Sequence, residues 1–340
     1  MDISRAMKDV KEGKVWPIYV LVGEDRYRVQ QFVTYLSETI FAVDERELGI
    51  VKFDTTETVI DEIILEAETV PFFLHKKLII VHDALLLTAG GKDVNKLDHK
   101  PDALLRYLEH PLESSIVVFI AQAEKLDERR KVVKQLKSRQ AVLTFDELDQ
   151  AQMKQWLLRR IQKQGRTITE AAAALLQVKT GNHMQQLAQE SDKLCLRVGE
   201  GGTIEESIVR ELIPDTAEEH VFALVDAIVE LRTEQALHLY KQLLLQREEP
   251  IKIIALIVRQ IRMMLQIKEL EQQHYSPKQM ASILGQHPYA IKLAAEKGKR
   301  LKQQQLATIL SQLADLDYNM KIGAANKTLA LELFILSLAA

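Results

Sequence analysis

The stretch "YVLVGEDRYRVQQFV", residues 19–33, places an apolar strand, a glycine and an amphipathic helix in immediate succession. Tyr19 to Val22 have the composition of a buried strand, Gly23 makes the turn, and helical spacing begins a few residues later. A strand that enters a helix through glycine is also the frame of a phosphate-binding loop. A working loop has the pattern G-x-x-x-x-G-K-[ST], in which backbone N–H groups and lysine hold the phosphates and the hydroxyl holds magnesium.

The residues that follow Gly23 do not supply this chemistry. Glu24 and Asp25 stand where the loop would surround a triphosphate, and their carboxylates would repel it. A divergent nucleotide site that uses Arg26 or Arg28 is the alternative, but the pattern favours an ordinary strand-to-helix turn. We therefore predict a degenerate P-loop near Gly23, no cofactor, and no ATP hydrolysis by this chain.

Short apolar runs rich in Val and Ile recur before residue 146, separated by amphipathic helical patterns. They predict strands of a mainly parallel sheet at 18–22, 50–54, 77–83, 114–122 and 141–145. After Phe145 the sequence predicts helices alone, including a capping box in which Thr203 pairs with Glu206. The predicted domains are an α/β domain at 1–146, a small helical domain at 147–213 and a larger helical domain at 214–340.

The composition excludes several classes of protein. The 340 residues are 47% apolar and 27% charged with a net charge of -3, which indicates a folded protein without a strong overall attraction to nucleic acid or membrane. The lone Cys195 excludes an internal disulfide, and the nine scattered histidines form no H-E-x-x-H motif. We predict no catalytic residue, no metal site and no membrane segment, and expect a cytoplasmic location.

Val70, Pro71, Phe72, Phe73 and Leu74 form an apolar run with neither helical nor strand periodicity. Neighbours on a helix point about 100° apart, so two adjacent rings cannot both enter one core from a short helix. An exposed apolar patch flanked by charge is a candidate partner site. The alternative is a turn that buries both rings beneath the sheet, and the pattern by itself does not decide between the two.

The basic stretch "EKLDERRKVVKQLKSR", residues 124–139, is the best candidate for contact with nucleic acid. It predicts a helix whose apolar side contains Leu126, Val132, Val133 and Leu136. Arg129, Arg130 and Lys134 are the candidate DNA contacts, because neutralising phosphates releases counterions. No aromatic side chain interrupts the run, so a solvated helix face is the favoured alternative.

The order and spacing of several strings resemble those of the delta subunits of bacterial DNA polymerase III. The strings are "PIYVLVGEDRYRVQQFV" and "AQAEKLDERRKVVKQLK" before residue 146, and "EEPIKIIALIVRQIRMMLQIKEL" and "MKIGAANKTLALELFI" near the carboxyl terminus. The resemblance implies an AAA+-like α/β domain, a small helical lid domain and an all-α collar domain. It also implies an inert phosphate-binding frame that is kept for subunit packing.

The resemblance further implies a subunit of a hetero-pentameric clamp loader that acts in DNA replication. The expected partners are the beta sliding clamp, the tau or gamma subunits that hydrolyse ATP, the delta-prime subunit and primed DNA. Residues 70–74 fall where delta subunits carry their clamp-binding element, a short helix whose apolar side chains enter a pocket on the clamp. Val70 is shorter than the methionine that is frequent there.

The residues leave two further hypotheses open, and the resemblance leaves one. In the first, the chain is an ATPase with an unorthodox phosphate site; in the second, it is a helical scaffold that binds another partner through residues 70–74. A delta-prime subunit is less favoured, because its zinc-binding cysteine cluster is absent here.

Overall fold

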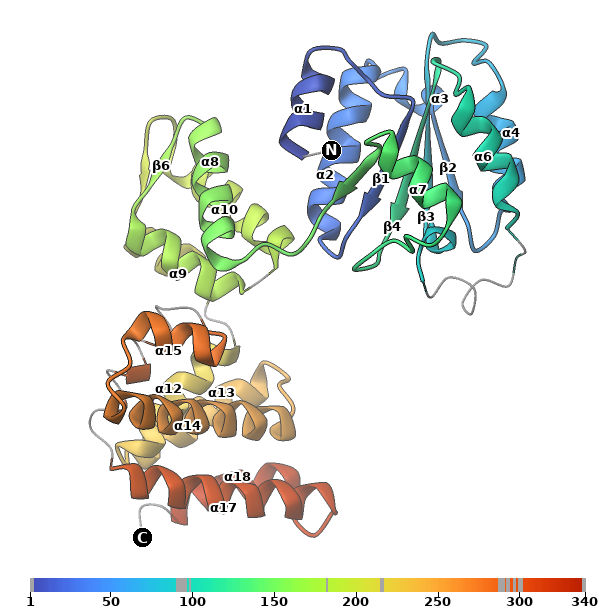
Figure 1. The fold of residues 1–340 in the computed structure, drawn as a ribbon. Coiled ribbons are helices and arrows are strands. Elements are labelled where there is room, and N and C mark those ends of the chain that lie inside the picture. The colour runs from blue at the N-terminus through green and yellow to red at the C-terminus, as the bar shows by residue number, and fades with distance from the viewer. Residues whose placement is uncertain are drawn as a thin grey trace. The chain divides into compact units, whose positions relative to one another are not determined.

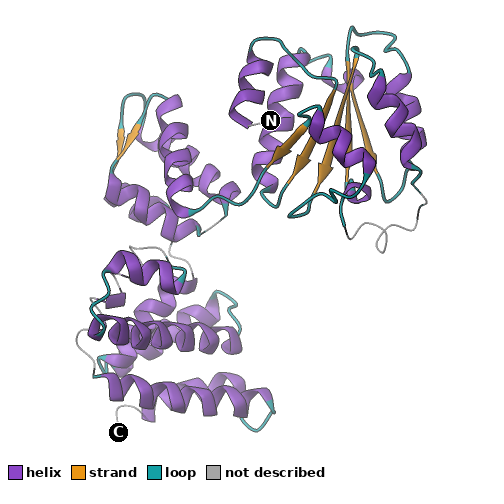
Figure 2. Ribbon diagram, viewed as in Figure 1, coloured by secondary structure: helices purple, strands orange, loops and turns teal. Residues whose placement is uncertain are grey.

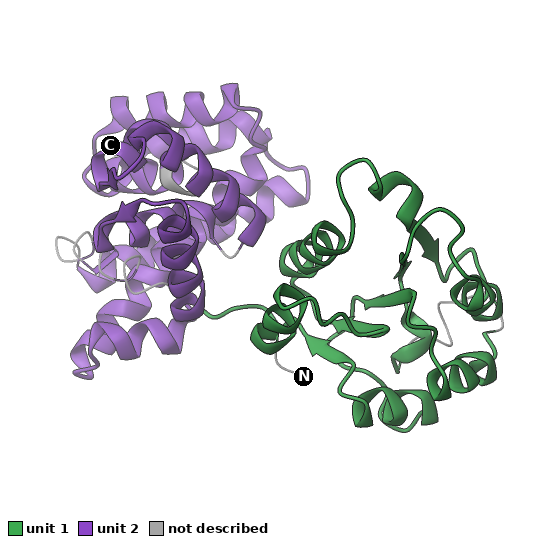
Figure 3. Cartoon of the chain, turned by 90° about the horizontal axis from the view of Figure 1, so that it is seen from above, with its two compact units in different colours: residues 1–149 green, residues 150–340 purple. Residues whose placement is uncertain are grey.

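The computed structural model describes residues 3–89, 97, 99–181, 183–214, 217–286, 291, 294–295, 298 and 302–337. The chain forms two compact units, residues 1–149 and 150–340 (Figure 3). The division falls close to residue 146, where the sequence pattern changes from mixed to helical. The additional predicted boundary between residues 213 and 214 stays a prediction.

The first unit contains a five-stranded parallel sheet with the strand order β2-β3-β4-β1-β5. The strands are β1 (Ile18–Val22), β2 (Ile50–Asp54), β3 (Lys77–His82), β4 (Ser115–Ala121) and β5 (Val142–Thr144). Each lies within a run that the sequence predicts as a strand. The predicted α/β fold with a mainly parallel sheet is confirmed.

Helices cover both faces of this sheet (Figures 1 and 2). The helical elements of the unit are α1 (Ile3–Lys11), α2 (Arg26–Ile40), α3 (Arg46–Gly49), α4 (Ile60–Glu68), the 3₁₀ turn η1 (Leu85–Leu87), α6 (Pro101–Glu109) and α7 (Lys131–Ser138). Alternate residues of β1 point into opposite cores: Val20 packs with α4, α6 and α7, whereas Leu21 packs with α1 and α2.

The second unit is predominantly helical, as predicted, with one exception. Its helices are α8 (Gln150–Lys163), α9 (Glu170–Thr180), α10 (Met184–Val198), α11 (Glu206–Leu212), α12 (Ala217–Val229), α13 (Thr233–Leu245), α14 (Pro250–Gln272), α15 (Pro277–Leu284), α17 (Gln303–Lys321) and α18 (Lys327–Ser337). The exception is a two-stranded parallel sheet of β6 (Thr167–Ile168) and β7 (Thr203–Ile204).

This small sheet corrects the predicted capping box at Thr203. The Thr203 hydroxyl lies 2.8 Å from that of Thr167 on the neighbouring strand, and the N-cap of α11 is Glu205 instead. Strands of two residues cannot be predicted from hydrophobic periodicity, because a period cannot be recognised in so short a segment.

The long apolar helices from α12 onward build their own core. Tyr240, Ile254, Ile257 and Ile261 are buried in it, and Leu237, Leu244 and Leu265 pack against it. These side chains are intradomain core. Within the described part of the chain, no helix combines the length and the apolar composition needed to cross a membrane.

Candidate functional site

Phe72 and Phe73 project from the loop that connects α4 to β3. Their exposed fractions are 91% and 78%, and their ring centroids lie 4.9 Å apart in an edge-to-face arrangement. Edge-to-face contact is a favoured geometry for two rings, so the pair forms one apolar projection. The alternative in which both rings lie beneath the sheet is wrong.

The remaining residues of the apolar run have different environments. Val70 is 67% exposed and Pro71 is half-buried, whereas Leu74 is partly buried and packs against the core on the α1 and α2 side of the sheet. Residues 72–75 form bends, not the short helix that the resemblance implied. Leu74 packs on the core directly after the two exposed rings.

An ion pair closes the base of this loop. Lys77 is 4% exposed, and its Nζ lies 2.7 Å from Glu66 Oε1 at the end of α4 and also donates to the Glu66 carbonyl. Thr69 Oγ1 donates to the Leu65 carbonyl at 2.9 Å, and the Lys77 N–H donates to the Ser114 carbonyl at 2.8 Å. The last turn of α4 and the first residue of β3 are thus joined, and the rings are displayed from a fixed base.

At the phosphate-loop position, Gly23 is required by a close approach of two strands. Its φ is +141°, and a Cβ atom there would lie 2.2 Å from the carbonyl oxygen of Phe145, just after β5. Backbone bonds join the same segments, from Phe145 N–H to the Val22 carbonyl at 2.6 Å and from Asp25 N–H to the Phe145 carbonyl at 3.2 Å. Packing therefore accounts for this glycine.

The amino terminus of α2, where a phosphate would bind, already holds a carboxylate. Asp25 is 6% exposed and is the N-cap residue, and it accepts a hydrogen bond from the Arg28 N–H at 3.0 Å. Arg28 Nε lies 2.5 Å from Asp25 Oδ2, and the same guanidinium donates to the Asp146 carbonyl. Because helix amino termini attract anions, Asp25 takes the place that a phosphate would need.

The candidate DNA contacts do not share one helix. Helix α7 begins at Lys131, so Arg129 and Arg130 lie in the preceding turn, which corrects the predicted single helix over 124–139. The turn interrupts the helix because Asp127 accepts from the Arg129 N–H. Leu126, Val132, Val133 and Leu136 are nevertheless buried as expected.

Asp127 also binds the side chains of this turn. Arg129 is bidentate on it, at 2.9 and 3.1 Å, and Arg130 lies 3.5 Å from it while donating to the Leu86 carbonyl. Hydrogen bonding from Arg129 lowers the pKa of Asp127 to about 2. Lys134 is exposed on α7. Contact of these residues with DNA stays a prediction.

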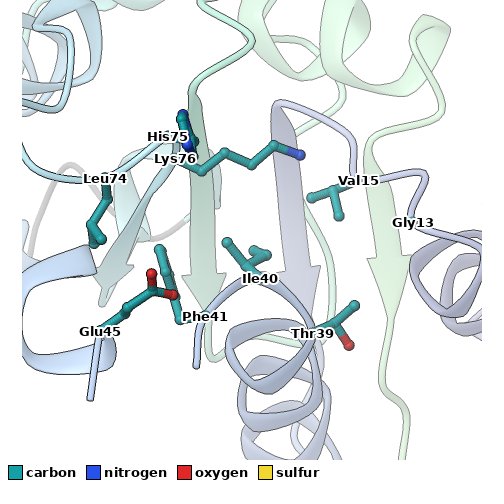
Figure 4. A pocket seen from close by; sticks show the side chains of 9 residues that line it. All are labelled: Gly13, Val15, Thr39, Ile40, Phe41, Glu45, Leu74, His75 and Lys76. Atoms are coloured by element: carbon teal, nitrogen blue, oxygen red, sulfur yellow. The ribbon is translucent and has the colours of Figure 1, made fainter. Parts of the chain in front are cut away.

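Two features of the site were missed by the sequence analysis. One is the Lys77–Glu66 pair, for which the available signal was a lysine at the start of an otherwise apolar strand. The other is a pocket of about 280 Å³ behind the loop, where Leu74, His75 and Lys76 form one wall (Figure 4). Its other walls come from residues within 13–15 and 39–45, so no pattern within a single segment predicts the pocket.

Comparisons with known proteins cover both units of the chain. The family model "DNA polymerase III, delta subunit" matches residues 19–146, and the model "DNA polymerase III delta subunit, C-terminal domain" matches residues 218–338. The DNA polymerase III subunit delta of Bacillus subtilis is 35% identical over 331 residues, which are 97% of this chain and 95% of the relative. The Escherichia coli subunit delta is 26% identical over 133 residues, which are 39% of this chain and 38% of the relative.

A solved structure has the same fold. The Bacillus subtilis DNA clamp loader delta protein superimposes with a TM-score of 0.66 at 34% identity, and the match covers 99% of both chains. The combined sequence and structural similarity confirms the resemblance inferred from the motifs. The chain belongs to the family of DNA polymerase III delta subunits, the delta subunits of the clamp loader.

Proposed function

We propose that this chain grips the beta sliding clamp with Phe72 and Phe73 and opens its ring, so that the clamp can be loaded on primed DNA during replication. The observation that carries the proposal is the exposed ring pair on a loop whose base is closed by Lys77 and Glu66. Membership of the clamp loader delta family supports it. Burial of two phenylalanine side chains contributes roughly 3 to 6 kcal/mol before the costs of association.

Opening a closed ring requires more than tight binding. A ligand shifts an equilibrium only by the difference between its affinities for the two states, so this chain must bind the open clamp better than the closed one. In the proposed mechanism the two rings provide the anchor, and the body of residues 1–149 presses on the neighbouring clamp interface.

The five residues of the apolar run have distinct proposed roles. Phe72 and Phe73 enter the clamp pocket, and Val70 adds a smaller exposed contact. Pro71 restricts the backbone ahead of the rings. Leu74 acts from inside, because its packing on the core determines that the rings face outward.

The central test removes both rings. Phe72→Ala with Phe73→Ala should weaken clamp binding at least about 100-fold, because an anchor of about 3 kcal/mol or more is lost. Circular dichroism should be unchanged, since both side chains are exposed. Leu196→Ala with Leu245→Ala is the matched control, because these leucines are 81% and 84% exposed in the other unit. Undiminished clamp binding by the ring variant would refute the assignment and favour a scaffold for another partner.

We also propose that the chain has no ATPase activity and that partner tau or gamma subunits hydrolyse the ATP. The Asp25 carboxylate at the amino terminus of α2 supports this, because it competes with a phosphate for the same N–H groups. Titration of the isolated chain with Mg·ATP, followed by calorimetry, should give no saturable heat. Saturable binding that Asp25→Ala strengthens would favour the unorthodox ATPase.

The proposed partners of the carboxyl-terminal helices are the tau or gamma and delta-prime subunits. Leu329 and Leu333 lie one turn apart on α18 and are 51% and 55% exposed, whereas Leu331 and Ile335 of the same helix are buried. Leu329→Glu with Leu333→Glu should leave the isolated chain folded and abolish its co-elution with partner subunits. Normal assembly of this variant would exclude the α18 surface from the subunit interface.

A further inference from the structure

The pocket behind the ring pair lies at the end of the sheet from which β3 starts. Its apolar lining comes from Val15, Ile40, Phe41 and Leu74, and its polar lining comes from Thr39, Glu45, His75 and Lys76 (Figure 4). The volume of about 280 Å³ is at the lower limit of ligand pockets, which begin at about 300 Å³. A pocket of this volume can hold a single side chain but is small for a cofactor.

The walls of the pocket are held by contacts within residues 1–149. Phe41 is 4% exposed, and its ring packs directly against Gly49, where a Cβ atom would lie 2.5 Å from the ring. The Glu45 carboxylate accepts from the Ala42 N–H at 3.0 Å and so restrains the loop after α2. Leu74 packs on the same core as Phe41. The pocket is therefore a preformed feature of the fold.

Exposed apolar side chains belong to both segments that border the pocket. The loop that supplies Leu74 and Lys76 carries Phe72 and Phe73, and the segment that supplies Phe41 and Glu45 carries Val43 and Leu48. Val43 is 79% exposed and Leu48 is 68% exposed. The ring pair and one wall of the pocket therefore belong to the same short loop, residues 72–76.

We propose that this pocket is a second anchor point for the sliding clamp and accepts one apolar side chain from the clamp surface beside the site of Phe72 and Phe73. The inference rests on the proposed function and deepens it. The preformed walls, the apolar part of the lining and the loop shared with the ring pair point to an occupant from the same partner.

Two anchor points explain how this chain exerts force on a ring. A single projecting ring pair leaves the bound clamp free to rotate about that contact. A second contact removes the rotation, so that a movement of residues 1–149 is transmitted to the clamp interface instead of being lost in pivoting. Binding energy is then directed toward the open state, which is the differential affinity that opening requires.

The first experiment fills the pocket. Thr39 is exposed on the last turn of α2 and lines the pocket, so Thr39→Trp is designed to fill the pocket from a position that is not buried. We expect clamp affinity to fall about tenfold, the loss of one buried apolar contact, and ring opening to fall further at saturating clamp. Gln30→Trp is the control, because Gln30 is exposed on the same helix and does not line the pocket. Unchanged affinity and opening for Thr39→Trp would overturn the proposal.

The second experiment reports on occupancy directly. Thr39→Cys provides one exposed thiol for an environment-sensitive fluorophore, because the native Cys195 is buried and burial raises the pKa of its thiol. Addition of sliding clamp should shift the emission to shorter wavelength as the probe is covered. A shift that depends on the concentration of this chain alone would identify a second copy as the occupant and overturn the proposal.

The two proposals fail in different ways. If Phe72→Ala with Phe73→Ala abolishes binding while Thr39→Trp has no effect, the ring anchor stands and the second anchor is wrong. If Thr39→Trp weakens binding while the ring variant binds normally, the pocket contacts the clamp and the ring anchor is wrong. The fluorophore at residue 39 separates these cases in the full chain.

Discussion

At Gly23 the backbone conformation and the space available both exclude a side chain. Gly23→Ala combines a φ of +141° with a Cβ position 2.2 Å from the Phe145 carbonyl oxygen, so either β1 or β5 must move. We expect the free energy of unfolding to fall by about 3 kcal/mol or more in urea denaturation, from overpacking and backbone strain together.

Gly13→Ala is the control for the contribution of φ. Gly13 also has a positive φ, +78°, but no heavy atom lies within 4 Å of its Cβ position. Its substitution should lower the free energy of unfolding by about 1 kcal/mol. If both substitutions lowered the free energy of unfolding equally, contact with Phe145 would not be the reason that residue 23 must be glycine.

The turn around Asp127 provides a prediction for pH. Arg129 hydrogen-bonds this carboxylate and lowers its pKa to about 2 in the folded chain, below the value of about 3.9 for an unfolded aspartate. A lowered folded pKa contributes stability above about pH 4, and this stability is lost as the pH falls through 2. The melting temperature of Asp127→Asn should therefore depend less on pH between 5 and 2 than that of the wild type, in unfolding scans at low salt. Identical pH profiles would contradict the contribution of Asp127.

At the scale of elements, the buried ammonium group of Lys77 joins α4 to β3 through its ion pair with Glu66. Glu66→Leu leaves the Lys77 ammonium, 4% exposed, with the Glu66 carbonyl but without its carboxylate partner, and should lower the free energy of unfolding by about 3 kcal/mol. Lys77→Met should lower it by less than about 1 kcal/mol, because methionine fills the same space and the released Glu66 side chain, 38% exposed, is solvated. Chemical denaturation of both variants measures this asymmetry.

A larger loss for Lys77→Met than for Glu66→Leu would reverse the interpretation of the pair. The ordering of the loop provides an independent measure. Glu66→Leu should increase hydrogen exchange at residues 69–76 more than in the sheet, because the loop loses the contact that closes its base.

At the scale of the whole molecule, residues 1–149 contain two complete cores, one on each face of the sheet. A fragment of these residues should fold alone and bind the sliding clamp through Phe72 and Phe73. Circular dichroism should show one cooperative thermal transition, and a pull-down should recover the clamp. A fragment without a cooperative transition would show that residues 150–340 are needed for the first unit to fold.

The predictions from sequence succeeded where local pattern and tertiary packing favour the same structure. The five strands were correctly predicted because each is a short apolar run, which the parallel sheet buries on both faces in β1, β3 and β4 and buries only in part in the edge strands β2 and β5. The two-residue strands β6 and β7 were missed, because only their pairing with each other, Thr167 with Thr203 and Ile168 with Ile204, distinguishes them from coil. The helix expected over residues 124–139 was too long, because Asp127 forms a turn with Arg129.

The sequence alone determined the α/β character of residues 1–146 and the predominantly helical character of the rest, because both follow from side-chain composition and spacing along the chain. Tertiary structure decided that both rings of Phe72 and Phe73 face outward, that Asp25 occupies the amino terminus of α2, and that a pocket lies behind the loop. Those features arise where residues distant in sequence meet, such as Leu74 with the core and residues 13–15 with 39–45. Periodicity describes one segment at a time, so it contains no information about which segments will become neighbours.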